Sequence, residues 1–453
     1  MFDLTENIIA QKTIGYIKPI WYFHFLSINS GSIFIDYKKI AKYKQEYIQY
    51  DMEYMSNDAI IWDAAFQGYS IGMFASSKDQ LMELNSLTIP SIDIYRFIRK
   101  YYGKKWVFYV LAVRLFKLQF YEEIKSFYLT RGVNQISQVN FIFKYLDFDN
   151  KKYTFINNNP LVSIIIPTLN RYKILSDLLV DLESQTYKNF EVIVIDQSDD
   201  FDRNYYNQYD LKIKLIPQNE KALWLARNRG VLESKSDLLL FLDDDSRIEC
   251  SWIINHLKCI EYFNADISAG ISKSIIGAPI PENYSFFRIA DQLDTGNVLI
   301  KKHVFKKCGL FDRQFEKQRM GDGEFGMRAH IHGFKSVSNP KAFRIHSKYY
   351  QGGLRELGSW DGFRPKKIFD PRPIPSVLYY WRNYWGSKSA LIQLIQIIPF
   401  SLNPYYLKGK KIGYFISVII FLLFFPLVIV QVFRSWICSS RMIKQGPQID
   451  FFD

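Results

Sequence analysis

Residues 237–248 read DLLLFLDDDSRI, in which an apolar run, Leu238 to Leu242, ends in three consecutive acids, Asp243, Asp244 and Asp245. A short apolar run that stops abruptly at polar residues is typical of a strand buried on both faces of a parallel sheet. Ligands of open α/β sheets collect outside the carboxyl ends of the strands, and three carboxylates at one strand tip repel one another unless a cation lies among them. Hard oxygen ligands of this kind suit Mg²⁺ or Mn²⁺. An isolated acidic triplet is equally consistent with a turn that caps the next helix, so its neighbours in the chain must decide.

The residues upstream of this strand alternate between strand and helix patterns. Apolar, β-branched runs predict strands over residues 162–166, 190–195 and 211–216. Between them, apolar residues at helical spacing predict one helix through Leu175, Leu178 and Leu182 and a second through Trp224 and Val231. This order predicts a doubly wound α/β sheet with right-handed crossovers, in which the polar residues after several strand tips share one crevice.

Length and composition limit the remaining choices. The chain has 453 residues, of which 48% are hydrophobic, so two or three folded domains are expected. The formal charge is +13, from 58 basic and 45 acidic residues, and this excess suits an anionic lipid or an anionic substrate. No nucleic-acid-binding motif accompanies the charge, so we expect no nucleic-acid partner. The four cysteines lack CxxC spacing and indicate neither a disulfide framework nor a zinc site.

Punctuation in the sequence predicts three regions. Residues 1–157, rich in Tyr, Phe, Ile and Lys, predict a mixed or helical accessory domain of unknown role. The turn signal at residues 157–160, Asn-Asn-Asn-Pro, marks the start of an α/β domain over 158–350. Residues 351–453 predict an aromatic, helical, membrane-associating region.

Within the last region, residues 412–433 contain no charge. A run of this length is sufficient to cross a hydrocarbon core of about 30 Å, so we predict a membrane helix. A buried core helix, a re-entrant segment and a helix in the membrane plane remain as alternatives.

Four motifs occur in a fixed order along the predicted α/β domain: SIIIPTLNR at 163–171, VIVID at 192–196, ARNRG at 226–230 and LDDD at 242–245. Further on, GNVLI at 296–300, an acidic segment at Asp322 and Glu324, and a histidine at 346 follow. Over residues 161 to about 347 this series resembles the family-2 glycosyltransferases with the GT-A fold. Each motif alone is weak, but the ordered set is specific.

The resemblance implies roles for individual residues. Nucleotide-sugar binding is implied for a set of residues on the first strand tips, on the second predicted helix and in the triplet, namely Pro167, Thr168, Asn170, Asp196, Arg227, Asn228, Asp243 and Asp244. The metal ligands implied are Asp243, Asp245 and His346, and the metal is Mn²⁺ or Mg²⁺. Simpler roles stay open: a turn acid for Asp196, a helix cap for Asn170, an exposed helix charge for Arg227 and a structural role for His346.

Asp322 is the candidate general base, because a sugar hydroxyl is a poor nucleophile until a positioned carboxylate takes its proton. Glu324 is assigned to acceptor binding or to support of that base. The sequence departs from the family at Gly321, where an acid usually precedes the base. It departs again at Lys221 and Trp224, in a segment that is usually glycine-rich.

These inferences together predict a membrane-attached, metal-dependent, inverting glycosyltransferase on the cytoplasmic face of the inner or plasma membrane. The expected donor is a UDP- or dTDP-sugar. The expected acceptor is a glycan or lipid-linked glycan in the assembly of a bacterial surface polysaccharide. Two alternatives are a nucleotidyltransferase or other phosphoryl-transfer enzyme, which would not need Asp322, and a non-catalytic scaffold with the same fold.

Overall fold

The structure is a computed structural model that describes residues 48–73, 89–102, 107–108, 110–111, 115, 120–136, 142–274, 285–290, 293–347, 362–407 and 410–452. The chain divides into two compact units. Unit 1 comprises Met1–Lys152, Pro279–Asp291 and Val337–Pro340, and unit 2 comprises Tyr153–Ala278, Gln292–Ser336 and Lys341–Asp453. The C-terminal region lies in the same unit as most of the sheet, and the division into three regions stays a prediction.

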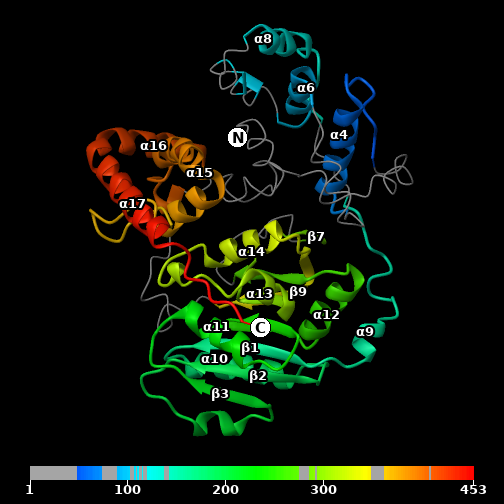
Figure 1. Cartoon of the computed structure of the whole chain (residues 1–453), viewed down its shortest axis with the longest axis vertical. Helices are drawn as coiled ribbons and strands as arrows, with labels where there is room; N and C mark the ends of the chain where they lie inside the picture. Colours follow the sequence, from blue (N-terminus) through cyan, green and yellow to red (C-terminus); the bar gives the residue numbers. More distant parts are fainter. Residues whose placement is uncertain are drawn as a thin grey trace. The chain divides into compact units, whose positions relative to one another are not determined.

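The described strands form one sheet in the order β3-β2-β1-β4-β8-β6-β9-β5, with β7 (Arg288–Ile289) paired to β9 (Figure 1). Its first half is parallel and consists of β1 (Val162–Thr168), β2 (Phe190–Asp196), β3 (Ile213–Pro217) and β4 (Leu238–Leu242). Its second half contains β5 (Ser246–Ile248), β6 (Ile267–Ser274), β8 (Asn297–Lys301) and β9 (Ser336–His346). The α/β prediction is thus confirmed, but the sheet is mixed, because β8 runs antiparallel to both β4 and β6.

The apolar pattern of the first strands matches their burial. Every residue of β1 and of β4 is buried, as expected for strands covered by helices on both faces. The covering helices include α10 (Tyr172–Glu183), which buries the predicted leucine face, and α11 (Leu223–Glu233). Gly230 lets α11 approach the sheet closely, since a Cβ atom there would lie 2.4 Å from Cγ2 of Ile165. The remaining elements of this part of the chain are α9 (Thr154–Asn157), η2 (Asn204–Gln208), α12 (Trp252–Tyr262), α13 (Lys302–Cys308), η4 (Arg313–Phe315) and α14 (Gly321–Ile331).

Strand register brings the predicted motifs to one edge. In the parallel half, Thr168 pairs with Asp196, so the tips of β1 and β2 lie side by side. After the acidic triplet, the chain turns into the short strand β5, which pairs antiparallel with β9 and places Ser246 opposite His346. This turn explains how a histidine about a hundred positions later in the chain reaches the triplet.

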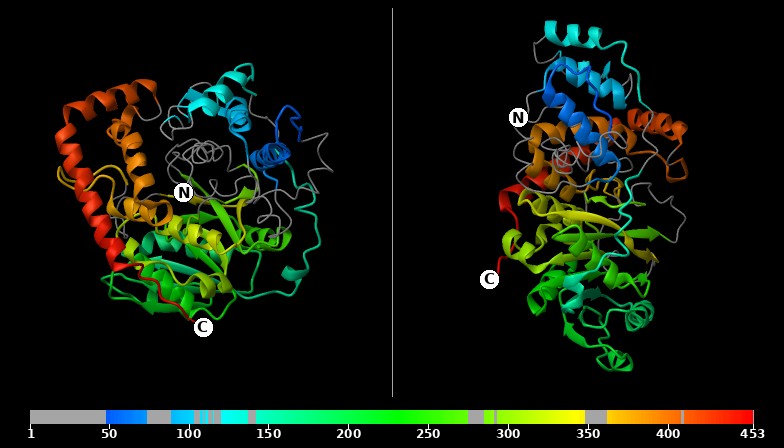
Figure 2. Two further views of the ribbon diagram at one scale, coloured as in Figure 1. Left: turned by 45° about the horizontal axis from the view of Figure 1, so that its top comes forward. Right: turned by 90° about the vertical axis from the view of Figure 1, so that its right-hand side faces the viewer.

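The C-terminal helices are α15 (Pro375–Ile397), α16 (Lys411–Leu423) and α17 (Phe425–Gln445), with the short η6 (Ile398–Phe400) and η7 (Tyr405–Leu407) between the first two. The prediction of one continuous helix over 412–433 is wrong, because the chain bends by 88° between α16 and α17 (Figure 2), whereas membrane association of this run stays a prediction. Pro426, in the first turn of α17, lacks the amide hydrogen that a continuous helix requires. Among the described residues, no single helix is long and apolar enough to cross a bilayer, although the bent pair passes that test together.

Unit 1 contains helices α4 (Asn57–Ser70), α6 (Ser91–Tyr102) and α8 (Phe120–Leu129). Its core is aromatic and includes Tyr95, Phe97 and Tyr102. A buried ion pair joins Lys100 to Asp63 at 2.6 Å and ties α6 to α4.

Candidate active site

Each of the three acids after β4 has its own set of cationic or polar partners. Asp243 accepts from Arg227 at 2.7 Å and from Arg344 at 3.0 Å. Asp244 accepts from the hydroxyl of Thr168 at 2.9 Å and from Arg171 at 3.2 Å. Asp245 lies 3.3 Å from Nε2 of His346 and 3.5 Å from Arg171. Of the three side chains, that of Asp243 is the most exposed, at 25%, so it is the one that reaches the crevice.

The electrostatics of the triplet differ from one acid to the next. Burial alone would raise the pKa of Asp243, but the charges of Arg344 and Arg227 outweigh burial and hold that pKa well below its usual range. Burial raises the pKa of Asp244 to about 6, against the opposing effect of Arg171. The site therefore keeps Asp243 ionised, while Asp244 is only weakly acidic.

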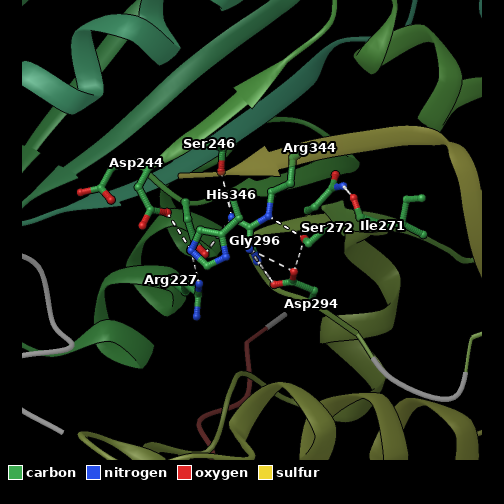
Figure 3. Close-up of polar contacts among 12 residues, drawn as sticks. Arg227, Asp244, Ser246, Ile271, Ser272, Asp294, Gly296, Arg344 and His346 are labelled. Atoms are coloured by element: carbon green, nitrogen blue, oxygen red, sulfur yellow. Dashed lines mark hydrogen bonds and ion pairs between the residues drawn. The ribbon is translucent and has the colours of Figure 1, made fainter. Parts of the chain in front are cut away.

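Arg344 is the central cation of the cluster (Figure 3). Its side chain is 2% exposed and reaches Asp243, both oxygens of Asp294 at 3.0 and 3.1 Å, and the hydroxyls of Ser272 and Ser246 at 2.7 and 2.8 Å. Gly296 makes room for it, since a Cβ atom there would lie 2.3 Å from Arg344 Nη2. Sequence reasoning missed Arg344, Asp294 and Arg171. For Arg344 a signal existed, because residues i and i+2 of a strand share a face and His346 is two residues further along β9.

The proposed metal ligands can be tested against this geometry. Asp245 and His346 face each other, whereas the oxygens of Asp243 are taken by two guanidinium groups. Across the described ranges, no three His, Cys, Asp or Glu side chains gather into a ligand set. Mg²⁺ is commonly held by one or two protein groups together with substrate phosphates. The Asp245–His346 pair fits that requirement, with a diphosphate as the remaining ligand.

The two acids proposed for catalysis lie in different environments at the start of α14. Glu324 is buried and bound on both sides, by Arg328 at 2.8 and 2.9 Å and by the hydroxyl of Tyr384 at 2.7 Å. Asp322 accepts a hydrogen bond from the backbone of Gly323 at 2.8 Å and is partly exposed. Burial, assisted by the negative charge of Asp294, raises the pKa of Asp322 to about 6. Asp322 is thus the acid with the access and the basicity that proton transfer requires.

One contact links Gly321 to Trp224, two positions at which the sequence departs from the family pattern. A Cβ atom on Gly321 would lie 2.3 Å from the indole of Trp224, so the indole fills the space where a side chain at position 321 would lie. Trp224 is anchored by a hydrogen bond from its indole nitrogen to the carbonyl of Phe315 at 3.0 Å, and Arg227 lies 5.0 Å from its ring centroid. The tryptophan on α11 therefore requires the glycine on α14.

Several predicted nucleotide-binding residues face other partners. Asp196 accepts from the hydroxyls of Tyr172 and Tyr206 at 2.8 and 2.7 Å and from the backbone of Ser198. Asn228 makes two hydrogen bonds with the backbone of Phe311, at 2.9 Å each. Their side chains hold the fold of this edge rather than pointing at the acidic cluster.

The other predicted residues on this edge lie in β1 or just after it. Thr168 is buried and turned toward Asp244, and Pro167 pairs with Ile195 inside the sheet. Asn170 follows the strand with φ 54° and bonds to Asp199 at 2.9 Å. Only Thr168 among these three contacts the triplet.

These features define an α/β domain whose sheet edge suits an anionic nucleotide ligand. Residues 163–309 match the family described as Glycosyl transferase family 2, and the predicted resemblance is confirmed over these residues. Glycosyltransferase AglE of Haloferax volcanii is 28% identical over 164 residues, which cover 34% of this chain and 53% of AglE. Poly(ribitol-phosphate) beta-N-acetylglucosaminyltransferase TarS of Staphylococcus aureus is 26% identical over 203 residues, covering 41% and 35%. The chain thus spans about half of the first relative and about a third of the second.

Among solved structures, the chain is similar to residues 1–349 of S. aureus TarS in complex with UDP-GlcNAc. The TM-score is 0.43 at 16% identity, with 64% of this chain and 97% of that one covered.

Proposed function

We propose that this protein is an inverting glycosyltransferase that moves a sugar from a nucleotide-sugar donor to a glycan acceptor. One observation carries the proposal: a partly exposed carboxylate with a raised pKa, Asp322, lies at the start of α14 within electrostatic reach of Asp294 and Arg227. A base and a cation that can bind a diphosphate are both needed for direct displacement at an anomeric carbon.

The residues would divide the reaction as follows. Asp322 takes the proton of the acceptor hydroxyl as its oxygen bonds to the anomeric carbon of the donor sugar. The bond from that carbon to the diphosphate breaks on the opposite face, so the configuration inverts and the nucleoside diphosphate leaves with the bonding electrons. Arg227, already ion-paired to Asp243, offers its guanidinium group to the diphosphate. A divalent cation held by Asp245 and His346, Mn²⁺ or Mg²⁺, would neutralise charge on the leaving group.

The finer parts of the proposal concern donor, acceptor and location. We propose a UDP- or dTDP-sugar as donor and a lipid-linked glycan of bacterial surface polysaccharide assembly as acceptor, with the enzyme attached to the cytoplasmic face of the membrane. Helices α16 and α17 support membrane attachment, because together they are long and apolar enough to cross a bilayer. They belong to the same unit as most of the sheet.

Calorimetric titration of UDP, dTDP and GDP, with and without Mn²⁺, tests the nucleotide site directly. We expect one diphosphate to bind in a metal-dependent manner and Asp245→Ala to abolish that binding. Asp237→Ala is a matched control, because this exposed acid lies at the opposite end of β4. Binding of none of the three would favour a non-catalytic scaffold. Full turnover by Asp322→Asn would favour a phosphoryl-transfer enzyme.

A further inference from the structure

Helices α16 and α17 have the reverse of the side-chain distribution expected in water. The residues that α17 buries along one face are mostly small or polar, namely Val428, Gln431, Ser435, Ser439 and Met442. In α16 the buried positions are Gly413 and Ser417, with the Ser417 hydroxyl bonded to the carbonyl of Pro399 at 2.9 Å. The large apolar side chains face outward instead. Those at the corner between the helices are among the most exposed: Leu422 65%, Leu423 72%, Phe424 52% and Phe425 47%.

The exposed apolar surface continues beyond the corner. On α17 it includes Ile429 and Phe433, and on α16 it includes Phe415, each between 45% and 65% exposed. Ile395 of α15, 68% exposed, extends the apolar surface to a third helix. Large apolar side chains exposed along neighbouring helices mark an interaction site, and a helix with apolar residues outside and polar residues inside is suited to lipid.

The charge of the same region selects the kind of lipid. Residues 371–449 contain nine basic residues and no acidic one, so most of the net charge of +13 is concentrated here. Lys410, Arg434, Arg441 and Lys444 are exposed and flank the apolar corner in sequence. Basic residues beside an apolar helical surface are attracted to anionic headgroups. A second copy of this chain is a poorer partner, because two such surfaces would bring like charges together.

The geometry limits how deeply the corner can enter. Helix α16 has 13 residues and spans about 20 Å, which is less than the hydrocarbon core of about 30 Å. The bend of 88° turns the chain back, and α17 ends beside η4, where the carbonyls of Met442 and Gly446 accept from the side chain of Gln314 at 2.8 and 2.6 Å. Figures 1 and 2 show the corner on the side of unit 2 away from the sheet.

We infer that the α16–α17 corner is a monotopic membrane anchor that enters one leaflet of an anionic bilayer and leaves on the same side. This inference rests on the membrane attachment proposed above and specifies its mode and its lipid. Its test does not use sugar transfer, so a failure of the anchor and a failure of the proposed activity give different results.

Flotation of the full-length protein with vesicles tests the lipid partner. We expect binding to phosphatidylcholine vesicles that contain phosphatidylglycerol, and much weaker binding to pure phosphatidylcholine. The double variant Leu423→Glu/Phe424→Glu should lose binding, while Val180→Glu/Leu232→Glu should retain it. The second pair is a matched control, because Val180 and Leu232 are 51% and 52% exposed on α10 and α11.

Replacing basic side chains near the corner measures the electrostatic contribution to vesicle binding. The triple variant Lys410→Gln/Arg434→Gln/Arg441→Gln should weaken binding to the anionic vesicles on the order of 100-fold, at about 1 kcal/mol per cation. Lys188→Gln/Lys212→Gln/Lys235→Gln, three exposed cations elsewhere in unit 2, should change it little. Equal binding of wild type to neutral and anionic vesicles would overturn the electrostatic part of the inference.

Cysteine labelling distinguishes a monotopic anchor from a span. With the more accessible native thiols replaced (Cys250→Ser and Cys438→Ser), Ile412→Cys and Arg441→Cys should both react with an impermeant maleimide added outside the vesicles. Protection of one of the two sites would show a span. Lipid is not the partner if folded wild-type protein fails to float with any vesicle. The same conclusion follows if Leu423→Glu/Phe424→Glu disrupts a dimer and leaves vesicle binding unchanged.

Discussion

At the scale of single residues, Asp322 governs the expected pH dependence. A base acts in its ionised form, and burial with the nearby charge of Asp294 places the pKa of Asp322 at about 6. We therefore expect the transfer rate to rise as the pH increases through about 6 and then to level off. Asp322→Asn should lower kcat by about 10²–10⁴ and abolish this rise, with nucleotide affinity little changed.

Asp294→Asn tests the origin of that pKa. It removes the negative charge that raises the pKa of Asp322, and this favours the ionised base. The midpoint of the pH–rate profile should therefore move to lower pH. A midpoint that stays in place or moves upward in steady-state rates between pH 4.5 and 8 would contradict this assignment.

The raised pKa of Asp322 also affects the stability of the folded protein. The pKa of Asp322 is higher in the folded protein than the value of about 4 in an unfolded chain, so the folded state binds the proton more tightly and loses stability as the pH rises from about 4 to about 6. Asp322→Asn should thus be more stable than wild type at pH 7.5, by about 1–2 kcal/mol once partial solvent exposure is allowed for. Thermal unfolding at pH 7.5 and at pH 4.5 checks this, and the advantage should shrink at the lower pH.

Trp224 and Gly321 should behave as a coupled pair. Gly321→Glu restores the acid typical of the family but collides with the indole, which is anchored to Phe315. We expect Gly321→Glu to lose about 1–3 kcal/mol of stability through overpacking. The double variant Trp224→Gly/Gly321→Glu should be more stable than the summed losses of the two single variants predict. Denaturant unfolding of both single variants and the double variant measures the coupling. Strict additivity would show that the two positions are independent.

Some residue roles were predictable and others were not. The acidic triplet follows from a strand end, because a position after a buried strand fixes where a side chain emerges, whereas Asp322 was identified through the resemblance of its segment to the family's acidic motif. Asp196 also follows a strand, but hydroxyls from Tyr172 and Tyr206 take up its oxygens. No spacing in the sequence shows that the short η2 helix brings Tyr206 there. The predicted nucleotide contacts of Asp196 and Asn228 remain predictions.

At the scale of elements, α15 stabilises α14, the helix that carries Asp322 and Glu324. Tyr384 of α15 donates to Glu324 of α14 at 2.7 Å, and the same carboxylate pairs with Arg328. Tyr384→Phe should lower stability by about 1–2 kcal/mol and also reduce kcat, since the start of α14 carries Asp322. Tyr379→Phe is the matched control, because its hydroxyl donates to Asp312 at 3.1 Å and not to Glu324. Equal losses of kcat in both variants would rule out a specific effect through Glu324.

Helices in this protein were predictable where periodicity and burial agree. The leucine face of α10 matches its buried face residue by residue. The uncharged run over 412–433 has no such periodicity, and hydropathy alone does not register that Pro426 divides it. The run length predicted a span, whereas the backbone chemistry of one residue produces a bend.

At the scale of the whole molecule, the order of segments along the chain differs from their grouping in space. We predicted a linear series with boundaries near residues 157 and 350. In the structure, two short segments from within the α/β region, Pro279–Asp291 and Val337–Pro340, belong to unit 1. Contacts between residues far apart in sequence determine this grouping, whereas a turn signal such as residues 157–160 indicates only where the chain turns locally.

Removing residues 1–152 should therefore damage more than an accessory domain. Phe287, which is 8% exposed, packs against Phe148 and Tyr145 with ring centroids 4.6 and 6.2 Å apart. Without these partners the ring is left to water, at a cost of about 1.5–3 kcal/mol. A chain that begins at Tyr153 should have a lower melting temperature and lower solubility than the full chain, and Phe287→Ser should recover solubility in the truncated chain but destabilise the full one. Differential scanning calorimetry of the four proteins decides the matter, because a truncated chain with the full melting temperature would show that residues 285–290 fold without the N-terminal segment.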